Sequence, residues 1–95
     1  MNETISHQEE GGRGSFFINH EGHRVATMTY RRTGEASVVF DHTLVSPALR
    51  GQGVARRLLD SAVSWARATG NRITPHCTYV VAQFAGDPSI ADVLA

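Results

Sequence analysis

The fold is decided by the stretch Leu49-Arg50-Gly51-Gln52-Gly53-Val54-Ala55, which joins a strand-like run to the only long amphipathic segment of the chain. A helix that begins here leaves its first backbone N–H groups without intrahelical acceptors, and the two glycines let a bulky anion approach them closely. The helix dipole adds positive potential at the same end. The stretch therefore predicts a phosphate-binding loop, with Arg50 as a cation beside it.

Two common phosphate-binding loops do not fit these residues. A loop of the Walker type ends in Gly-Lys-Ser or Gly-Lys-Thr, and the sequence contains no lysine. A dinucleotide-binding fingerprint needs a third small residue three positions after Gly53, where Arg56 stands. It also needs an acidic residue about twenty positions after Gly53, where the sequence has Ile73. The loop is therefore expected to hold the phosphate of a different ligand.

The segments around the loop predict a strand, a helix and a second strand. Apolar spacing predicts a helix from about Val54 to Thr69, ended by Gly70 in a left-handed conformation. The run Ala36–Val45 is expected to be a central strand, with Arg72–Pro75 parallel to it. Strict alternation puts Val38, Phe40, His42 and Leu44 on one face and Val39, Asp41, Thr43 and Val45 on the other.

The remaining segments complete a small α+β fold. The runs 15–18 and 24–31 predict a hairpin with its turn at Glu21-Gly22. Residues 1–14 have little to bury and are expected to be a flexible lead-in, so that 15–95 form a single domain. Two short helices are expected at the C-terminal end, over 78–85 and 88–94.

The composition excludes several classes of partner. Nine basic residues balance nine acidic ones, so no overall field attracts nucleic acid or an anionic membrane surface. The single cysteine excludes an internal disulfide, and no stretch has the roughly twenty apolar residues of a membrane span. His20 and His23 flank a turn with only Glu21 as a further ligand, so no metal site is expected. The chain is expected to be cytoplasmic.

The loop resembles the pyrophosphate-binding loop of the Gcn5-related N-acetyltransferases. That family's pattern is Arg or Gln, two residues, Gly, one residue, and Gly or Ala, which fits Arg50 to Ala55. Asp41-His42-Thr43 before the loop and Pro75-His76-Cys77 after the helix make the chain similar to the very short members of the family. The resemblance implies a minimal form of the family's fold, with acetyl-coenzyme A as cofactor. The cofactor-binding residues that it implies are Leu44, Val45, Arg50, Gly51, Gln52, Gly53, Val54 and Ala55.

Three residues are candidates for the acetyl-transfer chemistry that the resemblance implies. His42 precedes the point where the acetyl carbonyl is expected, and imidazole exchanges protons near neutral pH; the other interpretation is a buried structural histidine. Cys77 stands at the start of a predicted helix, where the dipole favours an ionised thiol, but free cysteines are also often simply buried. Tyr79 is a candidate acid for the leaving thiolate, as a tyrosine near this place is in many of these enzymes. Asp41 is expected to make structural hydrogen bonds.

The chain departs from the full-length members of the family. Only Glu21-Gly22 separates its first two predicted strands, where those members have a helical segment, and no strand is predicted after the last helices. The acceptor site must therefore be open or completed by another subunit, in a monomer or a homodimer. The main hypothesis is an acetyl-coenzyme A-dependent N-acetyltransferase acting on a small-molecule or peptide amine. The alternatives are a coenzyme A-binding module without turnover and a protein-interaction domain whose cleft binds a peptide strand.

Overall fold

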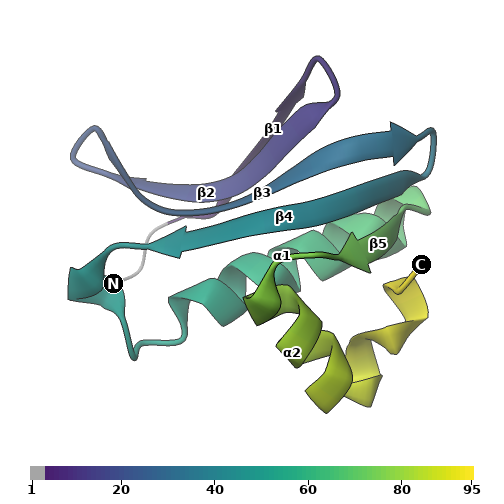
Figure 1. The fold of residues 1–95 in the computed structure, drawn as a ribbon. Helices are drawn as coiled ribbons and strands as arrows, with labels where there is room; N and C mark the ends of the chain where they lie inside the picture. The colour runs from purple at the N-terminus through teal and green to yellow at the C-terminus, as the bar shows by residue number, and fades with distance from the viewer. Residues whose placement is uncertain (1–3) are drawn as a thin grey trace.

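The computed structural model describes residues 4–95 as one mixed sheet with α1 and α2 on the same face (Figure 1). The strands lie side by side in the order β1 (Ser6–Glu10), β2 (Arg13–His20), β3 (His23–Gly34), β4 (Ser37–Val45) and β5 (Arg72–Pro75). The helices are η1 (Pro47–Leu49), α1 (Val54–Thr69), α2 (Thr78–Gly86) and η2 (Pro88–Val93), of which η1 and η2 are 3₁₀-helices. The predicted α+β class is confirmed.

The sheet splits beside the second half of β4. Strands β1 to β4 form an antiparallel meander, and β5 pairs with β4 in parallel, as predicted. This parallel pairing runs from Ser37 to Phe40 of β4 and goes no further. The backbone N–H groups of His76 and Cys77 both donate to the carbonyl of Phe40, so the chain after β5 turns away at this point. Among the described residues, 41–45 therefore have no strand neighbour on the β5 side.

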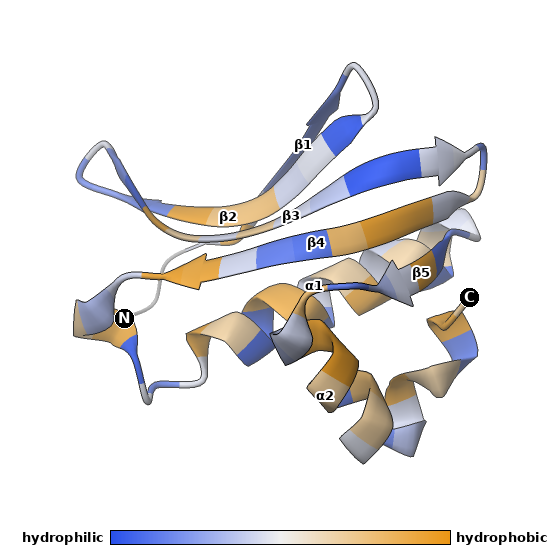
Figure 2. Cartoon of the chain, viewed as in Figure 1, coloured by the Kyte–Doolittle hydropathy of each residue, from blue (hydrophilic) through white to orange (hydrophobic). Residues whose placement is uncertain are grey.

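Helix α1 covers the core because its apolar residues repeat at helical spacing. It begins after Gly53 and ends at Gly70, both left-handed with φ angles of 71° and 73°, as the sequence predicts for the C-terminal end. The helix residues that face the sheet are Val54, Leu58, Leu59, Ala62, Val63 and Ala66. Figure 2 shows hydrophobic residues on β4 and β5 beside those of α1 and α2. Within residues 4–95, no helix is long and apolar enough to cross a membrane.

Strand β1 corrects the expectation of a flexible lead-in over 1–14, of which the first three residues lie outside the described part. The strand pairs antiparallel with β2 although all five of its residues are classed as exposed and none belongs to the core. The carboxylate of Glu9 accepts hydrogen bonds from the hydroxyl of the buried Tyr30 and from Nε of Arg32, each at 2.7 Å. Strand β1 is therefore held by residues that are distant in the sequence. The polar composition of 1–14 gives no sign of these contacts, so the strand was not predicted.

A β-bulge at Asp41 corrects the strict alternation expected for β4. Tyr30 lies opposite Phe40, whereas the preceding residue of β3, Thr29, lies opposite His42. Asp41 is therefore one extra residue in β4 without a partner of its own in β3. Because successive strand residues point to opposite faces, one extra residue exchanges the two faces of everything that follows.

The exchange decides which side chains meet the helices. Thr43 lies opposite the fully buried Met28, so Thr43 and Val45 are on the face that α1 covers. His42 and Leu44 turn to the outer face of the sheet, which neither α1 nor α2 covers, and both are exposed.

The C-terminal segment closes the far edge of β5. Ile73 forms an isolated parallel bridge with Leu94, and the N–H group of Ala95 donates to the carbonyl of Ile73 at 2.8 Å. The two short helices predicted here are present as α2 and η2. Both edges of β5 are thus occupied by the chain itself.

Candidate cofactor-binding and active site

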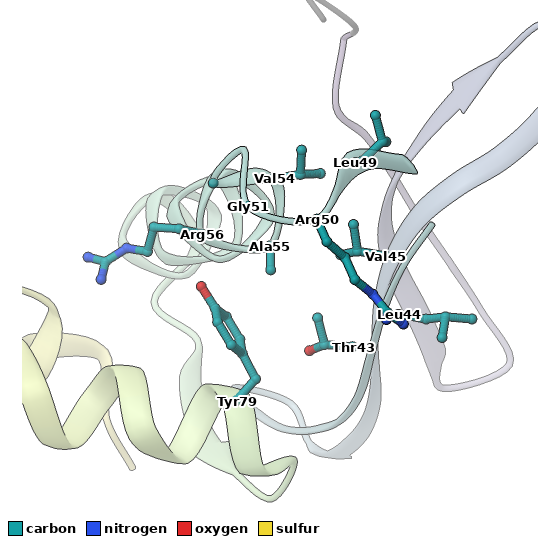
Figure 3. Close-up of a pocket in the computed structure, with 11 residues that line it drawn as sticks. Thr43, Leu44, Val45, Leu49, Arg50, Gly51, Val54, Ala55, Arg56 and Tyr79 are labelled. Atoms are coloured by element: carbon teal, nitrogen blue, oxygen red, sulfur yellow. The ribbon is translucent and has the colours of Figure 1, made fainter. Parts of the chain in front are cut away.

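A cavity of about 390 Å³ lies where the split in the sheet meets the start of α1 (Figure 3). It opens between residues 41–45 of β4, which we call the free half of the strand, the glycine loop and α2. Its volume suits a small-molecule ligand. The residues that line it are Thr43, Leu44, Val45, Leu49, Arg50, Gly51, Gly53, Val54, Ala55, Arg56 and Tyr79. Of the predicted cofactor-binding residues, all but Gln52 line this cavity.

The glycine loop leaves the start of α1 uncapped. Gly51 and Gly53 have φ angles of 79° and 71°, in the left-handed region that favours glycine. Gly53 is the N-cap residue, no side chain caps the helix, and the first turn contains no acidic residue. A Cβ atom added at either glycine would have no neighbour within 4 Å. The N–H groups of the first turn therefore face space that a phosphate or pyrophosphate fits.

Arg50 and Gln52 differ in what they offer a ligand. The side chain of Arg50 runs beside Val45 towards Leu44 in Figure 3, at the rim of the cavity. Within residues 4–95 its guanidinium has no carboxylate partner, so its charge is available. Gln52 turns its side chain back and donates to the carbonyl of Ala48 at 3.3 Å, so only its backbone remains for a ligand.

Arg56 also lines the cavity, but its positive charge is already paired with the carboxylates of Asp60 and Asp87. Its guanidinium donates to Asp60 at 2.9 Å, to Gln83 at 2.8 Å and to Asp87. These hydrogen bonds join α1 to the C-terminal end of α2 and so fix two walls of the cavity relative to each other. No local pattern identifies this role of Arg56, because two of its partners, Gln83 and Asp87, lie far away in the sequence.

Thr43 links the cavity to Cys77. Its Oγ1 atom lies 3.2 Å from Sγ of Cys77, which is half-buried at the N-cap of α2. The bulge at Asp41 turns Thr43 into the cavity, so strict alternation could not identify this residue. A signal was present, since aspartate is depleted in regular strands and its place in mid-strand indicates an irregularity.

Tyr79 reaches from α2 across the cavity towards the first turn of α1 (Figure 3). Burial raises the pKa of this tyrosine above its ordinary value, so the hydroxyl stays protonated near neutral pH. It is able to donate a hydrogen bond or a proton to an anion in the cavity.

His42 lies on the other side of β4. It is exposed on the outer face, so the interpretation as a buried structural histidine is wrong. Its neighbour Asp41 makes the structural hydrogen bonds that were expected, accepting from Oγ1 of Thr29 at 2.7 Å and from Arg13 at 3.2 Å. The structure thus brings Tyr79 into the cavity and leaves His42 outside it. Their catalytic roles stay predictions.

An uncapped helix start beside an unpaired strand edge defines a small α+β protein suited to a phosphorylated ligand with an extended arm. A model of the GCN5-related N-acetyl-transferase family matches residues 15–93, and the chain belongs to this family. None of the curated proteins matches the sequence.

Solved structures agree with the family. A GCN5-like protein from Staphylococcus aureus is 30% identical, with a TM-score of 0.75, and the match covers 99% of this chain and 89% of that one. Two further structures share the fold at lower identity. The ribosomal-protein-S18-alanine N-acetyltransferase from Escherichia coli is 14% identical with a TM-score of 0.66, and the match covers 82% of this chain and 53% of the enzyme. The aminoglycoside N-acetyltransferase AAC(6')-Iy in complex with CoA is 17% identical with a TM-score of 0.59, over 81% of this chain and 67% of that one.

Proposed function

We propose that the protein is an acetyl-coenzyme A-dependent N-acetyltransferase that acts on an amine still to be identified. The observation that carries the proposal is the cavity between the uncapped start of α1 and the free half of β4. Membership of the acetyltransferase family and a fold shared with an N-acetyltransferase in complex with CoA support it.

The proposed cofactor contacts follow from groups that lack partners. The backbone N–H groups from Gly51 to Ala55 would hold the pyrophosphate, with Arg50 adding a positive charge at the rim. The unpaired edge of β4 at 43–45 would hold the pantetheine arm through backbone hydrogen bonds, like those between neighbouring strands of a sheet. Acetyl-coenzyme A, when bound, supplies an acetyl thioester that is activated towards amines.

The side chains around the cavity would then manage protons and charge. Backbone N–H groups near Leu44 are the proposed donors to the acetyl carbonyl oxygen, where charge develops during attack. The hydroxyl of Tyr79, which is protonated near neutral pH and lines the cavity, would protonate the leaving sulfur. His42 would take the proton of an amine that approaches from the outer face, on which its side chain lies.

Cys77 offers a second route for the same reaction. Its sulfur lies against the wall of the cavity through Thr43, and it would accept the acetyl group before passing it to the amine. Direct attack by the amine needs no such intermediate. Intact-protein mass spectrometry after incubation with acetyl-coenzyme A separates the routes, since only the Cys77 route adds one acetyl group to the protein.

A coenzyme A-binding module without turnover is the second candidate. The outer face of the sheet, from which an acceptor would reach the split, is covered by neither α1 nor α2, and this favours a module without a shaped acceptor pocket. The test is incubation of the protein with acetyl-coenzyme A and a panel of primary amines, followed by mass spectrometry of the products. An acetylated amine whose yield falls in Tyr79→Phe supports the enzyme. Binding of acetyl-coenzyme A without any acetylated amine supports the module.

A further inference from the structure

One arginine of α1 holds the face of α2 that carries Tyr79. Gln83 and Asp87 follow Tyr79 at four and eight positions, so the three residues lie along one face of α2 and its C-cap. The guanidinium of Arg56 donates to Oε1 of Gln83 at 2.8 Å and to the carboxylate of Asp87. Arg56 therefore fixes this face of α2 against α1 at two points beyond the tyrosine.

The same arginine begins beside the hydroxyl of Tyr79. Both residues line the cofactor cavity, and in Figure 3 the tyrosine hydroxyl points towards the first turn of α1, from which the side chain of Arg56 leaves. Each nitrogen of the guanidinium already has an acceptor, because Nε donates to Asp60 at 2.9 Å and the two terminal nitrogens donate to Gln83 and Asp87. Arg56 is therefore placed to act on Tyr79 rather than on a ligand.

The charged groups around Tyr79 oppose one another. Burial has the largest effect and raises the pKa of the tyrosine, the positive charge of Arg56 lowers that pKa, and Asp60 and Cys77 raise it. Arg50 also lines the cavity, at the rim beside β4. Without Arg56, the carboxylate of Asp60 would act on Tyr79 without its partner and would disfavour a negative charge on the tyrosine.

We propose that Arg56 is a positioning residue for Tyr79, which fixes the helix face that carries the tyrosine and stabilises its ionised form. The inference rests on the proposed function, in which Tyr79 protonates the leaving sulfur. In that step the O–H bond of the tyrosine breaks, an S–H bond forms, and a tyrosinate is left in the cavity. The attacking amine releases one proton to solvent through His42, and the tyrosinate takes one back from solvent, so no further reactant is needed. The positive charge of Arg56 favours the tyrosinate and so promotes the transfer.

Titration of Tyr79 in the protein without cofactor tests the proposal. The chain has two tyrosines, so tyrosine labelled with ¹³C at Cζ gives two NMR signals, and Tyr79→Phe shows which one belongs to Tyr79. Arg56→Gln should make Tyr79 at least about threefold less acidic, because a positive charge beside it is lost. Arg56→Lys keeps the charge and should restore most of the acidity. The signal of the fully buried Tyr30, whose pKa is raised by burial and by Glu9, shows whether each variant is folded.

Arg67→Gln is the matched control. Arg67 also lies on α1 and binds a C-terminal segment, through two hydrogen bonds of 2.8 Å to Asp92, but it does not line the cavity. This variant should keep the wild-type pKa of Tyr79. An unchanged pKa of Tyr79 in folded Arg56→Gln, or an equal rise in Arg67→Gln, would overturn the proposal.

Turnover separates this inference from the proposed function. When an amine is acetylated, Arg56→Gln should lower kcat at least about threefold and leave the KM for acetyl-coenzyme A within about twofold, with most of kcat restored in Arg56→Lys. A raised KM with an unchanged kcat would overturn the inference and make Arg56 a cofactor-binding residue. If the wild type acetylates no amine, the proposed function fails, whereas the titration still decides whether Arg56 controls the acidity of Tyr79.

Discussion

Thr43 and Cys77 are 34 positions apart in the sequence, yet Oγ1 of one lies 3.2 Å from Sγ of the other. The contact joins the unpaired half of β4 to the start of α2 across the split in the sheet. It exists because the bulge at Asp41 turns Thr43 away from the outer face. We therefore expect the hydroxyl of Thr43 to influence the reactivity of Cys77, the only cysteine in the sequence.

The variant Thr43→Val tests this dependence. Loss of a hydrogen bond to an ionised sulfur, about 1.5–3 kcal/mol, should slow alkylation of Cys77 by iodoacetamide at least about tenfold at fixed pH. Intact-protein mass spectrometry measures the rate without interference, because the chain has one cysteine. Thr74→Val, an exposed threonine on β5, is the control and should react like the wild type. Equal rates in all three proteins would show that the contact does not affect the thiol.

Gly14 tests the packing between β2 and β3. A Cβ atom added at this glycine would overlap the ring of Tyr30, which is fully buried and has no space to move. We expect Gly14→Ala to destabilise the fold by about 1–3 kcal/mol, as overpacking does. At Gly34 an added Cβ would make an ordinary contact with Ser37 at 3.5 Å, so Gly34→Ala should stay within about 0.5 kcal/mol of the wild type. Denaturant midpoints compare the two, and equal midpoints would contradict the packing described.

The stability of the fold should fall in acid through Glu9. Hydrogen bonds from Arg32 and Tyr30 lower the pKa of this carboxyl to about 2 from its ordinary value of 4.5. A lowered folded-state pKa means that the unfolded chain binds the proton more tightly, so the stabilisation is complete above 4.5 and is lost as the pH falls towards 2.

Melting temperatures between about pH 5 and pH 2 measure this loss. Glu9→Gln should be less stable than the wild type at the upper end and should lose less stability as the pH falls. Glu10→Gln, an exposed neighbour on β1, should keep the wild-type dependence. If Glu9→Gln follows the wild-type curve throughout, the hydrogen bonds that hold β1 contribute nothing measurable.

The sequence predicted the central unit of the fold because its signals are local. Two glycines, an apolar helical repeat and a final glycine define the loop and α1 from their own residues. The parallel pairing of β4 with β5 follows from the length of the helix between them. The position of the cavity was therefore predictable from the residues of the loop and the end of β4.

The features that escaped prediction depend on distant partners. Strand β1 is held by the hydrogen bonds that Tyr30 and Arg32 donate to Glu9. No local pattern in this polar segment indicates those contacts. The bulge at Asp41 places Thr43 in the cavity and His42 outside it. Strict two-residue alternation could not predict this, because it assumes that the strand contains no extra residue. The one extra residue thus separates His42 from Tyr79, which lines the cavity.

Arg50 tests the charge at the rim of the cavity. Removing its guanidinium in Arg50→Ala should weaken acetyl-coenzyme A binding by about tenfold to a hundredfold, the value of one charge-assisted hydrogen bond. The fold should not change, because the side chain is exposed and has no carboxylate partner among residues 4–95. Calorimetric titration measures the affinity, with Arg31→Ala as the control. An unchanged affinity in Arg50→Ala would make Arg50 a surface residue without a role in binding.

The central claim is that the glycine loop at the start of α1 binds the pyrophosphate of acetyl-coenzyme A. The most direct measurement is the thermal shift caused by acetyl-coenzyme A in the wild type, in Gly53→Glu and in Gly22→Glu. Both glycines have positive φ angles, 71° and 80°, and an added Cβ at either has no neighbour within 4 Å, so the two variants carry matched strain and charge. At a hundred times the dissociation constant, the ligand should stabilise the wild type and Gly22→Glu by about 2.7 kcal/mol. Gly53→Glu should gain nothing, because its carboxylate occupies and repels the phosphate site. Equal stabilisation of the two variants, or none in the wild type, would contradict the claim.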